Sequence, residues 1–342
     1  MTTERIFRVA AVQPPSFAGA EEHRNGAQAC AFIQEAADAG ATYVVFPEGY
    51  PGPYSGPLEN DAISLVQECA RARHVWVSAG RIERAPVPGT YYIAHLLIDD
   101  RGEIRATYRR VQPNHPIFNA YLMGGRRHVL AGDELMTVDT PFGRLGLLIC
   151  SELFVPELAR ILMLRGADII VAPGGGAHGP TRTRLAETWR AVARARAAEN
   201  LVYVVVNQNL FSVSLRGRTC IASPEVMLVQ RDDPGIALAD IDLGRLREIR
   251  SHFYDEEILS APERDEQIYL CRPGQSHDRR PELYGELTRP QPDAFAYHYE
   301  RRGLETWRDE YDKIKEPTNA NGGSAGGEGP DRREPLEATV HR

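Results

Sequence analysis

Short apolar runs alternate with longer amphipathic stretches along about the first 250 residues of the chain. Runs of roughly four to eight residues rich in Val, Ile and Tyr predict strands, and apolar residues spaced three or four apart predict helices. We therefore expect strands at 7–12, 43–46, 74–80, 91–98, 104–108, 144–149, 169–172, 202–207, 219–223, 226–230 and 236–241. Helices are expected at 26–39, 63–73, 156–165, 183–200 and 243–249. This mixed order predicts an α/β domain with its helices outside the sheets.

The last quarter of the chain departs from this pattern. Residues 256–316 combine many tyrosines, prolines and charges, which predicts an extension packed on the body or on a partner subunit. From Pro317 onward the chain is Gly-rich and poor in apolar residues, so we expect 317–342 to form a disordered tail. The predicted globular domain is therefore 1–255.

Composition excludes several classes of protein. The chain is 42% hydrophobic and 25% charged, as globular proteins are. A net charge of -7 argues against a nucleic-acid binder, which usually carries a basic stripe. Since no apolar run approaches the ~20 residues of a membrane span, a membrane partner is not expected. The polar start of the chain lacks the pattern of an export signal, which predicts a cytoplasmic protein.

The cysteines point to chemistry rather than to cross-linking. Five cysteines, at positions 30, 69, 150, 220 and 271, show no CxxC spacing. We therefore expect no disulfide framework and no structural zinc site, but free thiols of which one is reactive. Cys150 is the candidate, because it ends the apolar run 143–149 and is followed by the polar pair Ser151 and Glu152. α/β enzymes place nucleophiles at such strand ends.

Several short motifs then follow one another in a fixed order. They are Phe-Pro-Glu at 46–48, Tyr-Arg-Arg at 108–110, Leu-Ile-Cys-Ser-Glu at 148–152, Pro-Glu at 156–157, Arg-Ala-Arg-Ala-Ala-Glu-Asn at 194–200 and Val-Val-Val-Asn at 204–207. In this order and spacing the chain resembles the nitrilase superfamily of carbon–nitrogen hydrolases, over about residues 6–255. No single motif is specific, but the ordered set is.

The resemblance implies a four-layer αββα sandwich, which members assemble as an αββα-αββα homodimer or a larger homo-oligomer. It also implies a Glu–Lys–Cys triad, no metal and no organic cofactor. Glu48 falls on the general base and Cys150 on the nucleophile. By its place in the Tyr-Arg-Arg motif, Arg110 falls on the lysine; the only lysines of the chain are Lys313 and Lys315, near its end.

The chemistry assigns each member of this triad a role. A thiolate attacks carbonyl carbon, so Cys150 needs a base, and we expect a nearby cation and the helix near 156 to favour the thiolate. Glu48 would accept the thiol proton, pass it to the leaving amine and later activate water. Arg110 could hold Glu48 and an oxyanion but not donate a proton. The alternative is that Arg110 is a surface arginine beside Arg109.

Other side chains are predicted to line the pocket. The resemblance places Glu152 where an acid shapes substrate binding, and the N–H of Ser151 in the oxyanion hole. A second family acid is missing, since 111–123 contains neither Asp nor Glu. The remaining candidates are Tyr50, Tyr54, His115, Phe118, Asn119, Gly175 and His178. The glycines at 174–176 lack the spacing and lysine of a phosphate-binding loop.

The leading hypothesis is a cofactor-free amidase that acts on a small-molecule amide. An amide is favoured over a nitrile because Ser151 replaces the aromatic residue that nitrilases usually carry after the cysteine, although Tyr-Pro-Gly-Pro-Tyr at 50–54 resembles the nitrile-active branch. Acyl transfer to an amine is a variant that shares the thioester. The alternative is a catalytically altered or inactive homologue that binds a small molecule or a partner. A third possibility is an anionic substrate recognised by Arg110.

Overall fold

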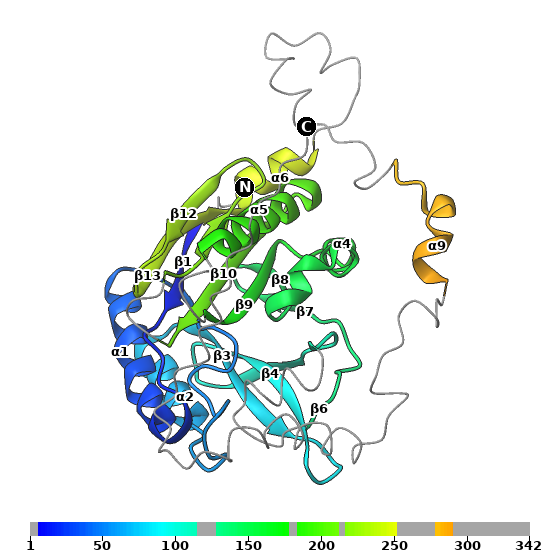
Figure 1. Cartoon of the computed structure of the whole chain (residues 1–342). Coiled ribbons are helices and arrows are strands. Elements are labelled where there is room, and N and C mark those ends of the chain that lie inside the picture. Colours follow the sequence, from blue (N-terminus) through cyan, green and yellow to red (C-terminus); the bar gives the residue numbers. More distant parts are fainter. Residues whose placement is uncertain (1–5, 115–127, 178–182, 212–215, 252–277, 290–342) are drawn as a thin grey trace, which may run out of the picture.

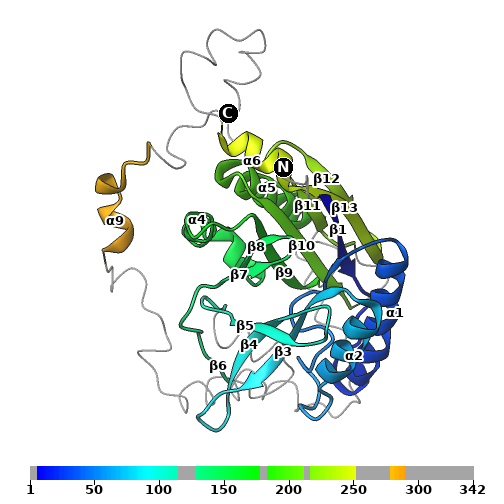
Figure 2. The same ribbon diagram turned by 180° about the vertical axis from the view of Figure 1, so that it is seen from behind.

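Two β-sheets stack face to face, and helices cover the outer face of each (Figures 1 and 2). The computed structural model describes residues 6–114, 128–177, 183–211, 216–251 and 278–289. Within these ranges, the order of layers is helix, sheet, sheet, helix. The predicted αββα sandwich is therefore confirmed.

The first sheet has the order β13-β1-β2-β3-β4-β5, with β6 paired to β4. Its strands are β1 (Ile6–Gln13), β2 (Tyr43–Val45), β3 (Trp76–Arg84), β4 (Thr90–Ile98), β5 (Ile104–Arg109), β6 (His128–Val129) and β13 (Gly235–Asp242). Strands β1, β2 and β3 run parallel to one another, whereas β3, β4 and β5 form antiparallel pairs. The helices α1 (Asn25–Asp38) and α2 (Ile63–Arg73) cover the outer face.

The second sheet has the order β12-β11-β10-β9-β8-β7. Its strands are β7 (Thr137–Thr140), β8 (Gly143–Leu147), β9 (Ile169–Ala177), β10 (Tyr203–Leu210), β11 (Thr219–Ala222) and β12 (Met227–Arg231). The helices α4 (Pro156–Leu164) and α5 (Thr183–Asn200) lie on its outer side, and α6 (Leu243–Ser251) follows β13 (Figure 2). Strands β8, β9 and β10 are parallel, so their carboxyl ends meet at one edge.

Side-chain alternation along β1 shows how the core is divided. Val9 and Ala11 face the second sheet, whereas Ala10 and Val12 face the helices. All four are fully buried, and burial stabilises each valine by about 1.5–3 kcal/mol. Polar bonds join the sheets as well, because Asn207 of β10 donates to the carbonyl oxygens of Val12 and Val45.

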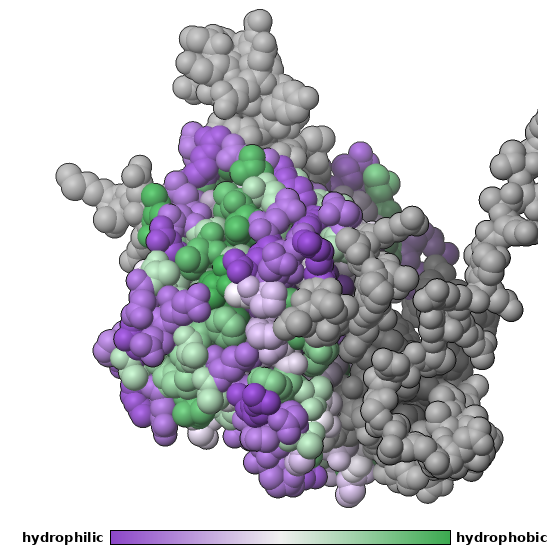
Figure 3. Space-filling model, turned by 60° about the vertical axis from the view of Figure 1, so that its left-hand side comes forward, coloured by the Kyte–Doolittle hydropathy of each residue, from purple (hydrophilic) through white to green (hydrophobic). Residues whose placement is uncertain are grey.

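The outer surface is mixed in character. On the side of the molecule formed by α1, α2 and the β12–β13 edge, apolar residues lie among polar ones (Figure 3). Ile6, at the start of β1, and Val226, just before β12, are exposed large apolar residues, at 59% and 53%. Among the described helices, none has the length and apolarity needed to cross a membrane.

The cysteines correct one expectation from the sequence. Cys30 of α1 and Cys69 of α2 form a disulfide, so the prediction that these thiols are free was wrong. The two residues are 39 positions apart, and only the packing of α1 against α2 brings them together. Cys150 and Cys220 are free and buried, as expected. Cys271 lies outside the described residues.

Most predicted elements are present, with differences at their ends. β9 continues through the glycines at 174–176 because β10 still pairs with it beyond a register shift between Asn207 and Asn209. The short strands β6 and β7 were missed, since two and four residues give no readable periodicity. The expected extension and tail fall largely outside the described residues. Residues 278–289 include the short helix α9 (Gly285–Thr288), which lies on the α4 side (Figures 1 and 2).

His95 on β4 is buried without a hydrogen-bond partner. The residue is 1% exposed and lies between Gly80 of β3 and Tyr108 of β5 in the sheet. Neither ring nitrogen has a partner among the described residues. Burial disfavours the charged imidazole and lowers the pKa of His95 to about 3. The folded protein therefore keeps this ring neutral where the unfolded chain would protonate it.

We expect acid to destabilise the protein partly through His95. Because its folded pKa lies below the ordinary value of about 6.5, stability is lost as pH falls from about 6.5 towards 3. The loss from this one residue between pH 7 and pH 4 is roughly 3 kcal/mol. Urea unfolding across this pH range should show this loss of stability in the unaltered protein but not in His95→Leu. The exposed His74, whose φ of 51° asparagine tolerates, provides the control His74→Asn. Parallel pH profiles for the unaltered protein and His95→Leu would contradict the prediction.

Candidate active site

The ends of four strands bring the predicted triad together at one edge of the sandwich. Glu48 follows β2, Arg110 follows β5 directly, and Cys150 begins a short 3-10 helix, η2 (Cys150–Phe154), after β8. Gly175 belongs to β9, and its N–H lies 3.4 Å from Cys150 Sγ. Arg110 Nη1 donates to Glu48 Oε1 over 2.9 Å. Residues from both sheets therefore meet in a single site.

The backbone bends sharply at the thiol. Cys150 has a φ of 55°, in the left-handed region that costs a non-glycine residue about 1–2 kcal/mol. The preceding Ile149 is extended, with φ -130° and ψ 120°. Such a strand-to-helix turn presents a nucleophile at the top of a sheet. Strain of this kind persists only where neighbouring contacts hold it, and here the contacts come from Glu152.

Glu152 stabilises this turn through hydrogen bonds. It is fully buried and accepts three hydrogen bonds, from Ile149 N at 2.7 Å, Gln112 N at 2.8 Å and Tyr108 Oη at 2.9 Å. Burial raises the pKa of this carboxyl, against the lowering effect of the charge on Arg110. The residue ties the thiol turn to the segment that follows β5. The acid expected to shape substrate binding thus has protein groups as its partners.

Burial also governs the thiol itself. Cys150 is 9% exposed, and its pKa is raised, first by loss of solvent and then by the negative charge of Glu48. Arg110, Arg218 and the N–H of Gly175 act in the opposite direction without reversing the shift. The nearby cation favours the thiolate, as expected, but its effect on the pKa of Cys150 is smaller than that of burial and Glu48. At neutral pH the site holds a thiol, and its activation needs a base.

Glu48 is an acid that lies beside this thiol. It is 3% exposed, its N–H bonds the carbonyl of Gly174 and its carbonyl accepts from Asn209 Nδ2. A Cβ on Gly175 would lie 2.7 Å from Glu48 Oε2 and 3.9 Å from Cys150 Sγ. The carboxylate and the thiol therefore face the same small space beside Gly175. Any larger residue at 175 would push into the carboxylate.

Arg110 is the third member and is 1% exposed. One end of its guanidinium binds Glu48, and Nη2 donates to Ser151 Oγ and, over 3.5 Å, to Asn114 Oδ1. Ser151 Oγ in turn donates to Asn114 Oδ1 over 2.9 Å. The guanidinium thus fixes both the base and the residue after the nucleophile. Its Nε has no partner among the described residues.

The alternative of a surface arginine applies to the neighbour instead. The side chain of Arg109 is 51% exposed and pairs with Glu83 at 3.0 Å. Arg110, by contrast, is held inside as a cation. Burial opposes its charge, but the carboxylate of Glu48 and other acidic neighbours outweigh burial and raise the pKa of Arg110 further above its ordinary value. A permanent positive charge therefore sits beside the base.

The two tyrosines of the 50–54 segment separate. Tyr50, expected over the pocket, is 1% exposed in the core under α1, and its hydroxyl donates to Gln28 Oε1 over 2.9 Å. That expectation is wrong, because Tyr50 points away from the thiol. Tyr54 packs its ring over Gly49, where an added Cβ would come within 2.1 Å of Tyr54 Cδ2. Burial and the charge of Glu48 raise the pKa of Tyr54, so its hydroxyl stays protonated.

The remaining predicted residues divide into two groups. Gly175 lies at the site, whereas four candidates fall outside the described residues: His115, Phe118, Asn119 and His178. Sequence reasoning missed Asn114 and Glu22, because no motif marks a lone amide or an acid in an exposed-looking helix. In the part of the chain that the structure covers, no group of three His, Cys, Asp or Glu residues is arranged to hold a metal ion.

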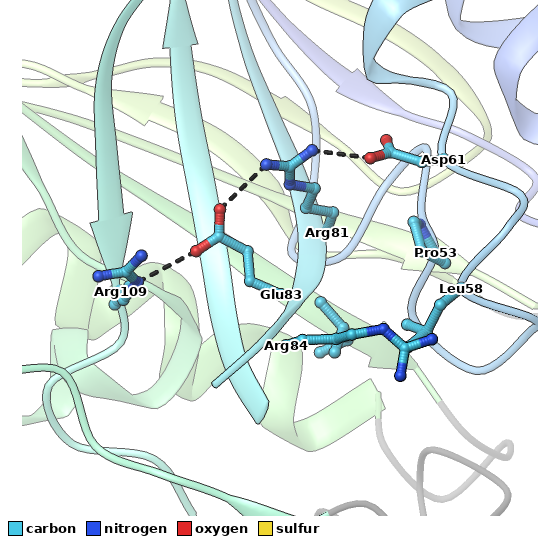
Figure 4. Close-up of a pocket in the computed structure, with 8 residues that line it drawn as sticks. Pro53, Leu58, Asp61, Arg81, Glu83, Arg84 and Arg109 are labelled. Carbon is cyan, nitrogen blue, oxygen red and sulfur yellow. Dashed lines mark hydrogen bonds and ion pairs between the residues drawn. The ribbon is translucent and has the colours of Figure 1, made fainter. Parts of the chain in front are cut away.

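A separate hollow of about 380 Å³, which none of Glu48, Arg110 and Cys150 lines, lies beside β3 and the end of β5 (Figure 4). An alternating chain of charges crosses it, from Asp61 to Arg81 to Glu83 to Arg109. Each acid in this chain is paired with an arginine, and no thiol or unpaired carboxylate enters the space. The residues that line the hollow therefore include neither a thiol nucleophile nor an unpaired acid that could act as a base in acyl transfer.

Known proteins are similar in sequence to most of this chain. Residues 8–251 match the sequence model of the family described as carbon-nitrogen hydrolase. Omega-amidase NIT2 of Homo sapiens is 29% identical over 247 residues, which cover 66% of this chain and 86% of that protein. Deaminated glutathione amidase of Homo sapiens is 28% identical over 297 residues, which cover 79% of this chain and 82% of that one.

Solved structures share the fold. The crystal structure of an amidase from Nesterenkonia sp. matches with a TM-score of 0.59 at 21% identity, over 71% of this chain and 92% of that chain. A mutant of that amidase from strain AN1, which shows covalent addition of the acetamide moiety of fluoroacetamide at its active-site cysteine, matches with a TM-score of 0.59 at 20% identity, again over 71% and 92% of the two chains. The nitrilase-like sandwich is therefore confirmed by structure as well as by sequence.

Proposed function

This chain belongs to the carbon-nitrogen hydrolase family, and we propose that within it the protein is a cofactor-free amidase that works through a Cys150 thioester. The observation that carries the proposal is the meeting of Glu48 and Cys150 beside Gly175, in a buried site that also holds a fixed cation. A raised thiol pKa next to a carboxylate is the arrangement in which a general base activates a nucleophile.

Acylation follows from these positions. Glu48 accepts the thiol proton as Cys150 Sγ forms a bond to the carbonyl carbon of the amide. The carbonyl oxygen becomes an oxyanion, which the backbone N–H of Ser151 and the guanidinium of Arg110 stabilise. Glu48 then gives its proton to the nitrogen, the carbon–nitrogen bond breaks, and the amine or ammonia leaves. The acyl group remains on sulfur as a thioester.

Deacylation reuses the same groups. Glu48 takes a proton from water as the water oxygen bonds to the thioester carbon, and the oxyanion forms in the same place. The carbon–sulfur bond then breaks, the carboxylic acid leaves, and the sulfur recovers its proton from Glu48. Arg110 keeps its proton throughout, since its pKa is too high for proton transfer. Its role is to hold Glu48 and the oxyanion.

The proposed substrate is a small amide rather than a nitrile. The residue after the nucleophile is Ser151, whose hydroxyl is bonded to Arg110 and Asn114, so it leaves no bulky ring over the thiol. The relatives named above are amidases, which supports an amide as well. Self-association and a cytoplasmic location stay predictions. Partly exposed apolar side chains on α4, Ile161 and Leu164, are compatible with self-association.

Mass spectrometry after incubation with a panel of small amides and nitriles tests the proposal. We expect the Cys150 peptide to gain the mass of the acyl group with amides, because the thioester lies on the reaction path. Cys150→Ala should show neither the adduct nor hydrolysis, whereas Cys220→Ala, at the other buried free thiol, should retain both. Amide hydrolysis that survives in Cys150→Ala would overturn the assignment. An adduct formed only with nitriles would overturn the choice of substrate.

A further inference from the structure

Glu22 is a buried acid that the catalytic scheme does not use. It lies in the 3-10 helix η1 (Gly19–Arg24) and is 3% exposed, while its neighbour Glu21 is exposed. Its carboxylate accepts three consecutive backbone N–H groups. Oε1 accepts from Tyr54 and Ser55 at 3.0 Å each, and Oε2 from Gly56 at 2.6 Å. Burying a carboxyl group is costly unless hydrogen-bond donors satisfy it, and here three N–H groups do so.

The fit between η1 and the loop is tight. A Cβ on Gly56 would lie 2.5 Å from Glu22 Oε2 and 2.5 Å from the carbonyl oxygen of Gly19. A Cβ on Gly52, whose φ is 114°, would lie 3.2 Å from Glu22 Cδ. Ser55 Oγ also accepts the N–H of Gly19 over 2.9 Å. The loop 52–56 and η1 therefore form one locked unit.

What this unit positions is Tyr54. Its ring lies on Gly49, the residue after the base, so that neither can move without the other. The same side chain packs against the core cluster to which Cys150 belongs, so the ring lies between the locked loop and the site. Glu22 is thus connected to the site through the backbone N–H of Tyr54 and the ring of the same residue.

We propose that Glu22 is a positioning residue that holds the Tyr54 ring against Gly49, next to Glu48, and so limits the space for the acyl group at the site. The kinetic test of this inference rests on the proposed amidase function, whereas the test by alkylation of Cys150 does not. Because Glu22 touches the loop backbone and not the reacting atoms, its loss should widen this space without removing the nucleophile or the base. Small acyl groups would then be held less well, and larger ones admitted more readily.

Kinetics with a series of amides of increasing acyl size provide the first test. Glu22→Gln places an NH₂ group against the loop N–H groups, so kcat/KM for the smallest amide should fall roughly 10- to 100-fold, as for a misplacement of about 1 Å. The loss should shrink as the acyl group grows. In a Tyr54→Phe background the same change should cost less, which a double-mutant cycle measures. The exposed neighbour provides the matched control Glu21→Gln.

Alkylation of Cys150 provides a test that does not depend on turnover. The rate of Cys150 modification, followed on its peptide, should rise in Glu22→Gln for bulky N-ethylmaleimide relative to small iodoacetamide, and stay unchanged in Glu21→Gln. A lower melting temperature with unchanged size preference in both assays would overturn the inference and leave Glu22 a purely structural residue. Failure of the unaltered protein to acylate would overturn the amidase proposal, while the alkylation ratio would still decide the role of Glu22.

Discussion

Glu48→Gln is expected to lower kcat/KM for amide hydrolysis roughly 10²- to 10⁴-fold, the range typical of general acid–base catalysis. Glutamine keeps the size of the side chain and an oxygen for Arg110 Nη1, but it cannot accept the thiol proton. Both acylation and deacylation need that proton transfer. The comparison of steady-state rates with the unaltered protein measures the loss.

The same substitution should have the opposite effect on the thiol. The negative charge of Glu48 raises the pKa of Cys150, so its removal should lower that pKa and leave the charge of Arg110 to favour the thiolate. Alkylation of Cys150 by iodoacetamide should then accelerate near neutral pH while hydrolysis collapses. Glu103→Gln, at an exposed acid in the turn before β5, should change neither rate. Hydrolysis that persists in Glu48→Gln would show that another group is the base.

Arg110→Met is expected to damage stability and activity together. It leaves the carboxylate of Glu48 buried without its cation, a change that typically costs about 3–5 kcal/mol. It also removes a donor to the oxyanion, which typically costs on the order of 10²- to 10³-fold in kcat. Urea unfolding and steady-state kinetics measure the two effects. Arg105→Met, at an exposed arginine of β5, the strand that Arg110 follows, is the matched control.

Arg110→Lys separates the charge from the shape of the guanidinium. A lysine can keep the pairing with Glu48, so we expect most of the stability to remain. It cannot also reach Ser151 and Asn114 as the planar fork does, so kcat/KM should fall about tenfold, less than in Arg110→Met. An inert native protein that gains turnover in Arg110→Lys would contradict the amidase proposal. That result would favour the alternative of a catalytically altered homologue.

The partners of Arg110 fix its position. Its guanidinium is bonded to Glu48, Ser151 and Asn114, so the side chain occupies a defined place. The structure therefore has an ordered positive charge beside Glu48, supplied by an arginine.

Local pattern was enough for the layers of the fold. Strand and helix periodicity predicted nearly all of the elements, because a strand or helix that buries one face has apolar residues at a regular spacing along the sequence. Cys150 was predicted as the nucleophile because it ends an apolar run, whereas Glu48 was predicted as the base from the resemblance of its motif to the family. In the structure the two residues lie shortly after β8 and β2. The strand ends were less predictable, since the glycines of β9 pair with β10 through backbone groups that carry no side-chain signal.

What the sequence by itself determined is therefore the α/β sandwich, whereas Cys150 as nucleophile and Glu48 as base stay predictions. Only the tertiary structure decided the burial of Arg110, the direction of Tyr50 towards α1, the Cys30–Cys69 disulfide and the clamp made by Glu22. The physical reason is common to all four. The environment of a polar side chain is created by residues from distant parts of the chain, so its charge, exposure and partners become defined only when the sheets and helices pack.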